Sequence, residues 1–351
     1  YKQAFQLFRE AAEQGHGKAM YNLASMYYKG HGTGQNEAEA YAWFKKSAEL
    51  GHAKAAYNVG IINARKTEDG KPKYNSNAQK WLQQAAEAGD VDAQCELGLM
   101  YTTVRSIKEE NTTALKWLKK AAEQNHARAN YFLGLMYLNG DGAKKDLSKG
   151  IQHLKVAAEQ GYTKAQYNMG VLYHEGTGFP RNPAKAFEWY SKAASDNHTD
   201  AQYNIATLYS NLNKPEPYYS DAFKWYERAA RNGKPEAQFN AGMMYLKGHG
   251  TTQNSQKAVE WLNKARSQGY PPASIELGKL YSEGRYVSEN STKAYELLIG
   301  PAENGHAEAQ YYIGLVFYKT PTSEYREKAR GWFEKAAKQG YAKAEYYLNQ
   351  Y

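Results

Sequence analysis

The segment from 161 to 196 contains two stretches in which apolar residues recur with the period of an α-helix. In the first stretch they stand at i, i+4, i+7 and i+8 and form one stripe, which consists of Ala165, Met169, Leu172 and Tyr173. A glycine-containing turn follows, and Asn182 then offers an N-cap with Pro183 at the first helical position. The second stripe consists of Ala186, Trp189, Tyr190, Ala193 and Ala194. It ends before Asn197, a residue type that adopts the left-handed conformation at helix ends. The pattern predicts a helical hairpin, whose two helices are named helix A and helix B.

The same pattern recurs along the whole chain. The residue that ends helix B returns in steps of 36 residues, apart from one step of 38 and one of 35. These residues are Gly15, Gly51, Gly89, Asn125, Gly161, Asn197, Gly233, Gly269, Gly305 and Gly340. Because a hairpin of two short helices cannot bury both stripes alone, neighbouring copies must stack. The sequence predicts an all-α solenoid that forms a single elongated repeat domain over 1–351. Its nine units start near 15, 51, 89, 125, 161, 197, 233, 269 and 305, and the partial units are 1–14 and 340–351.

Three sets of equivalent residues refine this prediction. Alanine recurs four residues after each helix end, and glycine or alanine follows five residues later, which indicates two close contacts between helices. Helix B is expected to start at Asn36, Asp146, Asn182, Asn254 and Asn290. One core-facing place of helix B holds Trp43, Trp81, Trp117, Trp189, Trp225, Trp261 and Trp332. We expect these tryptophans to be core residues rather than a ligand-stacking surface.

These motifs resemble a known family. The helix pattern small-x-Y-x-L-G-x-x-Y, the G-x-G turn and the helix pattern A-x-x-W-(Y/F/L)-x-K-A-A-E-x-G are similar to the Sel-one-like repeat, a relative of the tetratricopeptide repeat. The resemblance covers essentially the whole chain. It implies a right-handed superhelical solenoid with the A helices inside, used as a protein-interaction scaffold. It also implies a bacterial envelope or secreted protein that acts as a host-interaction adaptor, or less readily a protein of the endoplasmic reticulum lumen.

Composition and cysteine content narrow the class further. The 45 basic and 36 acidic residues give a formal net charge of +9, but they are interleaved without a basic run, which argues against nucleic-acid binding. No apolar stretch reaches the ~18 residues of a membrane span. Cys95 stands alone, so an internal disulfide is excluded, whereas some bacterial members of the resembled family carry a cysteine pair in each repeat. Because the chain starts inside a helix B and stops inside a helix A, we expect a piece of a longer protein.

Residue patterns that carry catalysis or metal binding are weak in this sequence. Five of the nine histidines directly follow a helix end, one repeat apart, and none pairs with another at i, i+4 spacing. The five are His16, His52, His126, His198 and His306. No nucleophile elbow or phosphate loop is present. We therefore expect no catalytic residue, no cofactor and no metal. The alternative is an enzyme, or a regulator of one, that acts on cell-wall material with its active groups in the groove or outside this segment.

One face of helix A carries the candidate partner-binding residues. The places one before the recurring alanine and three, six and ten after it share this face, because successive residues turn by about 100°. Its asparagines either bond a neighbouring repeat and fix the superhelical pitch, or clamp the backbone of an extended peptide. Its charges change sign along the array, so a partner's acidic segment or terminal carboxylate is expected at the amino-terminal end. The candidate residues are Lys18, Asn22, Lys29, Lys54, Asn58, Arg65, Arg128, Lys164, Asn168, Asp200, Asn204, Glu236 and Asn240.

Overall fold

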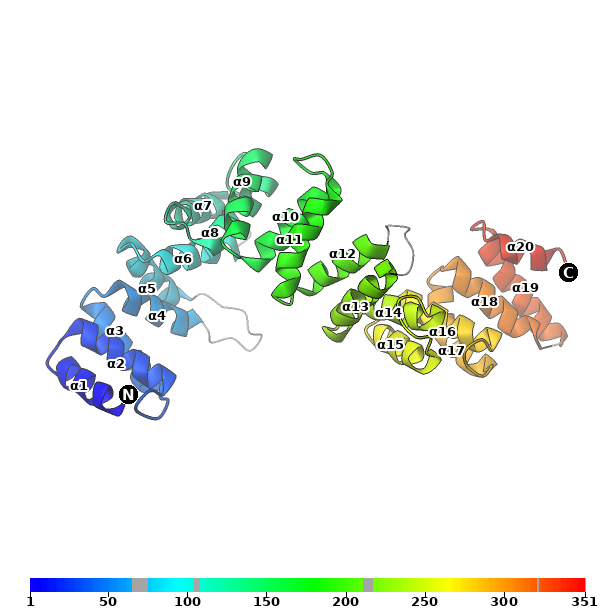
Figure 1. Ribbon diagram of the computed structural model, residues 1–351, viewed down its shortest axis with the longest axis horizontal. Helices are drawn as coiled ribbons and strands as arrows, with labels where there is room; N and C mark the ends of the chain where they lie inside the picture. Colours follow the sequence, from blue (N-terminus) through cyan, green and yellow to red (C-terminus); the bar gives the residue numbers. More distant parts are fainter. Residues whose placement is uncertain (65–74, 104–107, 211–216, 321, 351) are drawn as a thin grey trace. The chain divides into compact units, whose positions relative to one another are not determined.

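The structure, a computed structural model, describes residues 1–64, 75–103, 108–210, 217–320 and 322–350. Within these ranges the chain forms twenty α-helices and no strand (Figure 1), so the predicted all-α solenoid of helical hairpins is confirmed. The helices are α1 Lys2–Glu13, α2 Gly17–Lys29, α3 Glu37–Glu49, α4 Ala53–Ala64, α5 Ser76–Glu87, α6 Val91–Thr103, α7 Lys108–Glu123, α8 Ala127–Asn139, α9 Leu147–Glu159, α10 Thr163–Glu175, α11 Pro183–Ser195, α12 Thr199–Ser210, α13 Pro217–Arg231, α14 Pro235–Lys247, α15 Ser255–Ser267, α16 Pro271–Glu283, α17 Ser291–Glu303, α18 Ala307–Tyr318, α19 Ser323–Ala337 and α20 Ala342–Leu348. Even numbers are A helices and odd numbers are B helices.

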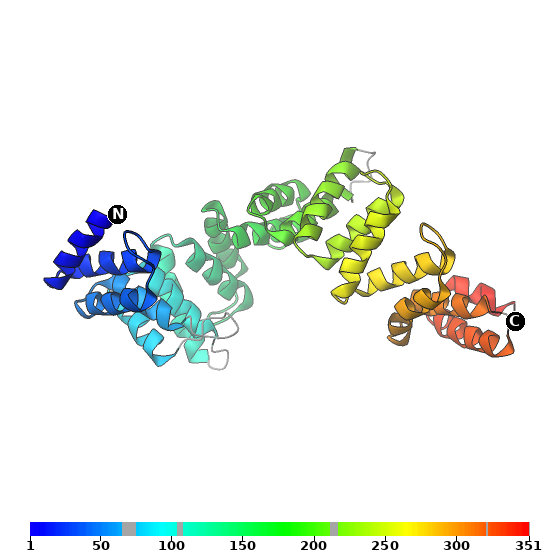
Figure 2. The ribbon, with the colours of Figure 1, turned by 90° about the horizontal axis from the view of Figure 1, so that it is seen from below.

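Backbone contacts divide the chain into two compact units, Tyr1–Ala186 and Phe187–Tyr351. Inside each unit an A helix packs against the B helix that follows it and the B helix that precedes it, as α8 packs against α9 and α7 (Figures 1 and 2). Consecutive A helices also touch, as α6 touches α8 and α16 touches α18. Whether residues 1–351 act as one domain stays a prediction.

The predicted helix boundaries are confirmed by capping geometry. The side chain of Asn36 accepts a hydrogen bond from the backbone N–H of Glu39 at 3.1 Å, and each of the four equivalent residues caps its own B helix. At the other end of helix B, Asn125 and Asn197 have φ of 60° and 62°, the left-handed conformation that glycine adopts in the other repeats. The chain therefore ends every helix B with the same local geometry.

Inside each hairpin the two helices approach each other at a residue without a large side chain. A Cβ atom placed on Gly98 of α6 would lie 2.7 Å from Cγ of Leu118 in α7. A Cβ atom on Gly278 of α16 would lie 2.4 Å from Cγ of Leu298 in α17. Such distances are shorter than van der Waals contact, so the predicted close approach is confirmed and packing explains why glycine is kept inside these helices.

Between hairpins, buried glutamines form a connection that the sequence interpretation missed. Gln238 of α14 donates from Nε2 to the carbonyl of Ala230 at 3.2 Å, and its Oε1 accepts from Nε2 of Gln268, one repeat later, at 2.8 Å. The same arrangement joins Gln94 to Gln124, Gln202 to Asn232, and Gln310 to Gln339. In the first two repeats the equivalent places hold Met20 with Leu50 and Ala56 with Ala88, so the polar pair is replaced by apolar residues on both sides. Replacing both partners in these two repeats avoids leaving a buried amide with one bond missing, a cost that remains at Gln166, whose Oε1 has no partner among the described residues.

The tryptophans are less buried than predicted. Trp117 is 8% exposed, and the other six are only half-buried, so the prediction overstated their depth. Five of these six still pack against the core from its edge: Trp43, Trp81, Trp225, Trp261 and Trp332. A cation of the same helix covers each ring, for example Lys264 at 4.2 Å from the ring centroid of Trp261 and Lys335 at 3.9 Å from that of Trp332. The outer face of each indole therefore packs under a basic side chain rather than inside the core.

The close approach inside the hairpin predicts opposite effects for two glycine-to-alanine changes. Gly278→Ala should lower the free energy of unfolding by about 1 to 3 kcal/mol, because its methyl group collides with Leu298. Gly331→Ala in α19 is the matched control. It has no atom within 4 Å of the new Cβ, so it should be neutral or stabilising by up to about 1 kcal/mol. Urea unfolding of both variants measures this, and equal effects would contradict the packing argument.

The glutamine pair predicts a coupled effect on stability. Gln268→Ala should lower the free energy of unfolding by about 1 kcal/mol, because it leaves Oε1 of the buried Gln238 without its donor. The double variant Gln238→Met, Gln268→Leu introduces the residue pair that Met20 and Leu50 form in the first repeat. Its loss of unfolding free energy should be smaller than the sum of the losses caused by Gln238→Met alone and Gln268→Leu alone. A double-mutant cycle by thermal unfolding measures the coupling. Strictly additive costs would mean that the two amides do not support each other.

Candidate partner-binding face

Three A helices of the first unit carry an exposed lysine in their first turn, whereas α6 carries Asp92 at the same place. Lys18, Lys54 and Lys164 are exposed at the second position of α2, α4 and α10, and none makes an ion pair with a residue in the described ranges. A cation here opposes the helix dipole, which favours negative charge at the N-terminus. Burial, together with the ammonium groups of Lys18 and Lys54, lowers the pKa of His52. These three ammonium groups therefore have no ion-pair partner within the described ranges, although Lys54 lies near enough to Asp90 to affect the pKa of that carboxyl.

Farther along the face, the charged residues pair with one another. Arg128 of α8 forms an ion pair with Glu96 of the preceding A helix. In the second unit, Lys234 lies 2.7 Å from Oδ1 of Asp200 and 3.5 Å from Oε2 of Glu236. Partial burial opposes the charge of Lys234, but the hydrogen bond and the attraction of the two carboxylates outweigh it and raise its pKa. The structure thus places Arg128, Asp200 and Glu236 on the expected face, but with partners inside the chain.

The five asparagines on this face are half-buried and fall into two groups. The side chain of Asn58 donates to the carbonyl of Lys54 at 2.8 Å, a bond within its own helix α4. Asn168 and Asn240 interact with the hydroxyls of Tyr131 and Tyr226, which lie on neighbouring helices. These two contacts, but not that of Asn58, agree with the interpretation that the amides hold adjacent helices. Asn22 and Asn204 make no side-chain hydrogen bond to any described residue, so their amides remain available to a ligand.

Two further candidates lie at the ends of A helices. Lys29 is exposed at the last position of α2, next to Gly30. Arg65 lies outside the described residues, so its place on the face stays a prediction.

The histidines that precede helix A have a role that sequence interpretation missed. In His52, His126 and His198, Nδ1 accepts a hydrogen bond from the backbone N–H three residues later, at 3.1 to 3.3 Å. The imidazole therefore serves as an N-cap in these three repeats, whereas His16 and His306, at the same place, make no such bond. In His126 the other nitrogen, Nε2, lies 3.2 Å from Oδ1 of Asp92. Because Nδ1 accepts, Nε2 carries the hydrogen and donates it to this carboxylate.

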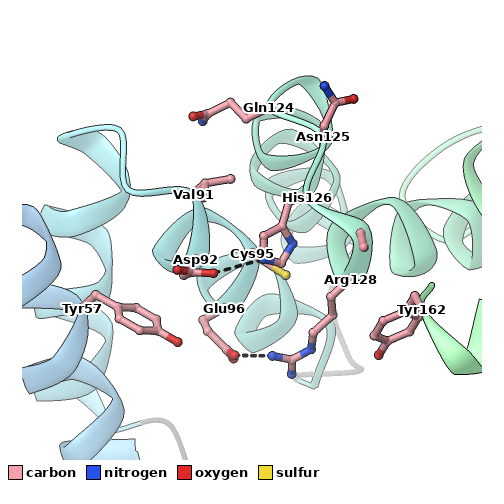
Figure 3. A pocket seen from close by; sticks show the side chains of 11 residues that line it. Tyr57, Val91, Asp92, Cys95, Glu96, Gln124, Asn125, His126, Arg128 and Tyr162 are labelled. Carbon is pink, nitrogen blue, oxygen red and sulfur yellow. Dashed lines mark hydrogen bonds and ion pairs between the residues drawn. The ribbon is translucent and has the colours of Figure 1, made fainter. Parts of the chain in front are cut away.

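A hollow of about 560 Å³ opens on this face in the first unit (Figure 3). Its lining comes from α4, α6 and α8, from the turn before α8, and from Tyr162 just before α10. Tyr57 and Tyr162 stand on opposite sides, and the bonded pairs Asp92–His126 and Glu96–Arg128 lie between them (Figure 3). The sequence signal for this hollow was Cys95, which stands where most repeats carry an aromatic ring.

The chemistry of the hollow is that of a binding surface rather than a reactive centre. Burial raises the pKa of the Cys95 thiol to about 12, so the thiol stays protonated and is a poor nucleophile at neutral pH. Burial, reinforced by the negative charges of Glu96 and nearby aspartates, raises the pKa of Tyr57 to about 12. Its hydroxyl is therefore a neutral hydrogen-bonding group.

Neither a metal-ligand cluster nor a membrane-spanning helix occurs in the part of the chain that the structure describes. No three His, Cys, Asp or Glu side chains there come together in a way that could hold a metal ion. No helix in those ranges combines the length and the apolar content needed to cross a bilayer.

Comparison with known proteins assigns the repeats to a family. The Sel1 repeat model matches ten consecutive segments, at 1–16, 17–52, 53–90, 91–126, 127–162, 163–198, 199–234, 235–270, 271–306 and 307–341. These boundaries agree with the predicted unit length. No curated protein matches the chain.

Two solved structures resemble most of the chain. A protective antigen present in uropathogenic Escherichia coli strains, which displays an SLR fold, is 27% identical, with 97% of this chain and 73% of that chain covered and a TM-score of 0.77. A Sel1 repeat protein from Oxalobacter formigenes is 31% identical, with 88% of this chain and 91% of that chain covered and a TM-score of 0.61. Proteins of this kind commonly mediate protein–protein interactions, and their repeat scaffolds are generally non-catalytic. With its repeats matched along nearly its whole length, the chain belongs to the Sel1 repeat family.

Proposed function

We propose that this chain is a non-catalytic scaffold that binds an extended segment of a partner protein along the face of its A helices. The observation that carries the proposal is the set of exposed cations Lys18, Lys54 and Lys164 at the starts of α2, α4 and α10. Each opposes the dipole of its own helix and has no ion-pair partner among the described residues. Because each of these lysines slightly destabilises the helix that carries it, its presence is explained by a role in binding.

The regular spacing of these groups favours an extended ligand. Equivalent residues on the A helices recur once per repeat, as an extended chain requires, and in the first unit this place holds a cation on α2, α4, α8 and α10 and Asp92 on α6. The side-chain amide of Asn22, which makes no hydrogen bond to a described residue, offers a donor and an acceptor and can pair with a peptide group whatever side chain it carries.

The charges give this segment a direction. An acidic segment or a terminal carboxylate would lie over Lys18, Asn22, Lys29 and Lys54. Each exposed charge pair contributes under about 1 kcal/mol, so the cations set orientation and association rate more than affinity. In the second unit Asp200 and Glu236 already contact Lys234, so a basic group of the partner would have to compete with that ammonium.

The alternative of an enzyme acting on cell-wall material gains no support from the hollow. Its single thiol, that of Cys95, is held protonated by burial. The carboxylates of Asp92 and Glu96 are bonded to His126 and Arg128 rather than to each other, so they do not form a proton-sharing pair.

Charge reversal on the A-helix face tests the proposal. Peptides are first selected on the wild-type protein from a random peptide library, and their association rates are then measured by surface plasmon resonance at low and high salt. The double variant Lys18→Glu, Lys54→Glu should slow association at low salt and flatten its salt dependence.

The matched control makes the same change of charge on B helices, with Lys45→Glu and Lys116→Glu in α3 and α7. These residues are exposed on the opposite helices of the hairpins, so the association rate should change much less. If both double variants slowed association equally, the slowing would come from the changed net charge of the protein. That result would contradict a binding site on the A helices. Failure to select any peptide would contradict the proposed function itself.

A further inference from the structure

The A helices carry a row of rings at one place, two residues after the recurring alanine. The row comprises Tyr21, Tyr57, Tyr131, Tyr167, Tyr203, Phe239 and Tyr311. Cys95 and Ile275 take the same place in the remaining full repeats. The hollow described above lies at the first of these two exceptions.

Rings in this row pack against the residue that directly precedes the next A helix. Tyr21 stacks on His52, with ring centroids 4.7 Å apart and an interplanar angle of 20°. Tyr131 lies 5.0 Å from Tyr162 by the same measure. In the second unit, Phe239 contacts Tyr270 and Tyr311 contacts Tyr341 in the same way. The contact between a row ring and the following cap residue is therefore a regular part of the repeat.

In the repeat of Cys95 this contact has lost one partner. The residue before the next A helix is His126, the equivalent of His52, and its imidazole lines the hollow. Cys95 is only 1% exposed and forms part of the inner wall, because its side chain ends far short of a tyrosine ring. The hollow thus includes the seat that a tyrosine at position 95 would fill against His126, and the seat opens on the A-helix face between Tyr57 and Tyr162 (Figure 3).

We propose that this seat receives an aromatic side chain of the partner's extended segment, which packs against His126 where the ring of this repeat is missing. The inference rests on the proposed binding function and adds to it a specific residue class in the partner. The row itself supplies the model for the contact, since Tyr21 makes it with His52 within this chain.

The rim of the hollow favours a ring that carries a hydrogen-bond donor. Arg128 forms an ion pair with Glu96, so a glutamate of the partner would find no unpaired cation there, whereas His126 donates to Oδ1 of Asp92 as a neutral imidazole and leaves this carboxylate able to accept from a donor. Oδ2 of Asp92 makes no hydrogen bond to a described residue, and the side chain is 56% exposed. A tyrosine O–H or a tryptophan N–H can donate to this oxygen, whereas phenylalanine cannot.

Filling the seat from within the chain tests the proposal. The probes are the peptides selected on the wild-type protein, each compared with a version in which its aromatic residue is alanine. Cys95→Tyr inserts the ring that other repeats carry, and it should weaken peptide binding at least tenfold, as much as removing the peptide's aromatic residue does. The two changes together should weaken binding no more than either alone, because they remove the same contact. Cys95→Ala keeps the seat open and should bind like the wild type.

A second variant keeps the test decisive if Cys95→Tyr does not fold. His126→Asn removes the ring but retains a good N-cap for α8, and it should weaken the aromatic peptides three- to tenfold and their alanine versions not at all.

The outcomes separate this inference from the proposed function. Selected peptides whose association is slowed by Lys18→Glu, Lys54→Glu but whose affinity is indifferent to Cys95→Tyr, or in its place to His126→Asn, would overturn the aromatic seat alone. Selection of peptides without any enriched tyrosine or tryptophan would also overturn it. Failure to select any peptide would overturn both.

Discussion

Each hairpin of this protein depends on the contact between a residue without a large side chain on helix A and a large apolar residue on the following helix B. At Gly98 and Leu118, as at Gly278 and Leu298, the backbone of one helix rests on the side chain of the other, with no room for a methyl group between them. This contact fixes the distance and the axial register of the two helices, and the same geometry then places the apolar stripes so that the next hairpin can cover them. The buried glutamine pairs act at the following level, because they link one hairpin to the next through amides whose bonds are satisfied only in one register.

These two kinds of contact use the sides of helix A that face helix B and the adjacent repeats, and they leave one face open to variation. On that face the first-turn residue changes from Lys54 to Asp92 to Arg128 along the first unit without disturbing the hairpins. The ring row is equally tolerant, since Cys95 replaces a tyrosine while the contact at Gly98 is maintained. Single repeats can thus determine partner specificity while the contacts that hold the array together stay uniform, as is usual in solenoids.

Much of the fold was predictable because short segments of the sequence specify it. Apolar spacing, N-caps such as Asn36 and the helix-ending residues need only a few neighbouring positions, and the structure confirms them. The glutamine pairs were not predicted, because a lone glutamine in a helix resembles a surface residue and its partner lies about 30 residues away. The depth of the tryptophans was misjudged because the wheel position shows the direction of a side chain but not the lysine that covers it, as Lys264 covers Trp261. The pairing of Arg128 with Glu96 and the hollow at Cys95 depend on distances between successive A helices, which no single repeat encodes.

The central claim is that the partner lies on the A-helix face, and site-specific photo-cross-linking measures this most directly. The photoreactive amino acid p-benzoylphenylalanine replaces either Lys164, exposed at the start of α10, or Lys116, exposed on the B helix α7. Each protein is then irradiated with a selected peptide. The account predicts an adduct with the probe at position 164 and none with the probe at position 116, and unlabelled peptide should suppress the adduct. Cross-linking at position 116 alone, or equally at both positions, would contradict it.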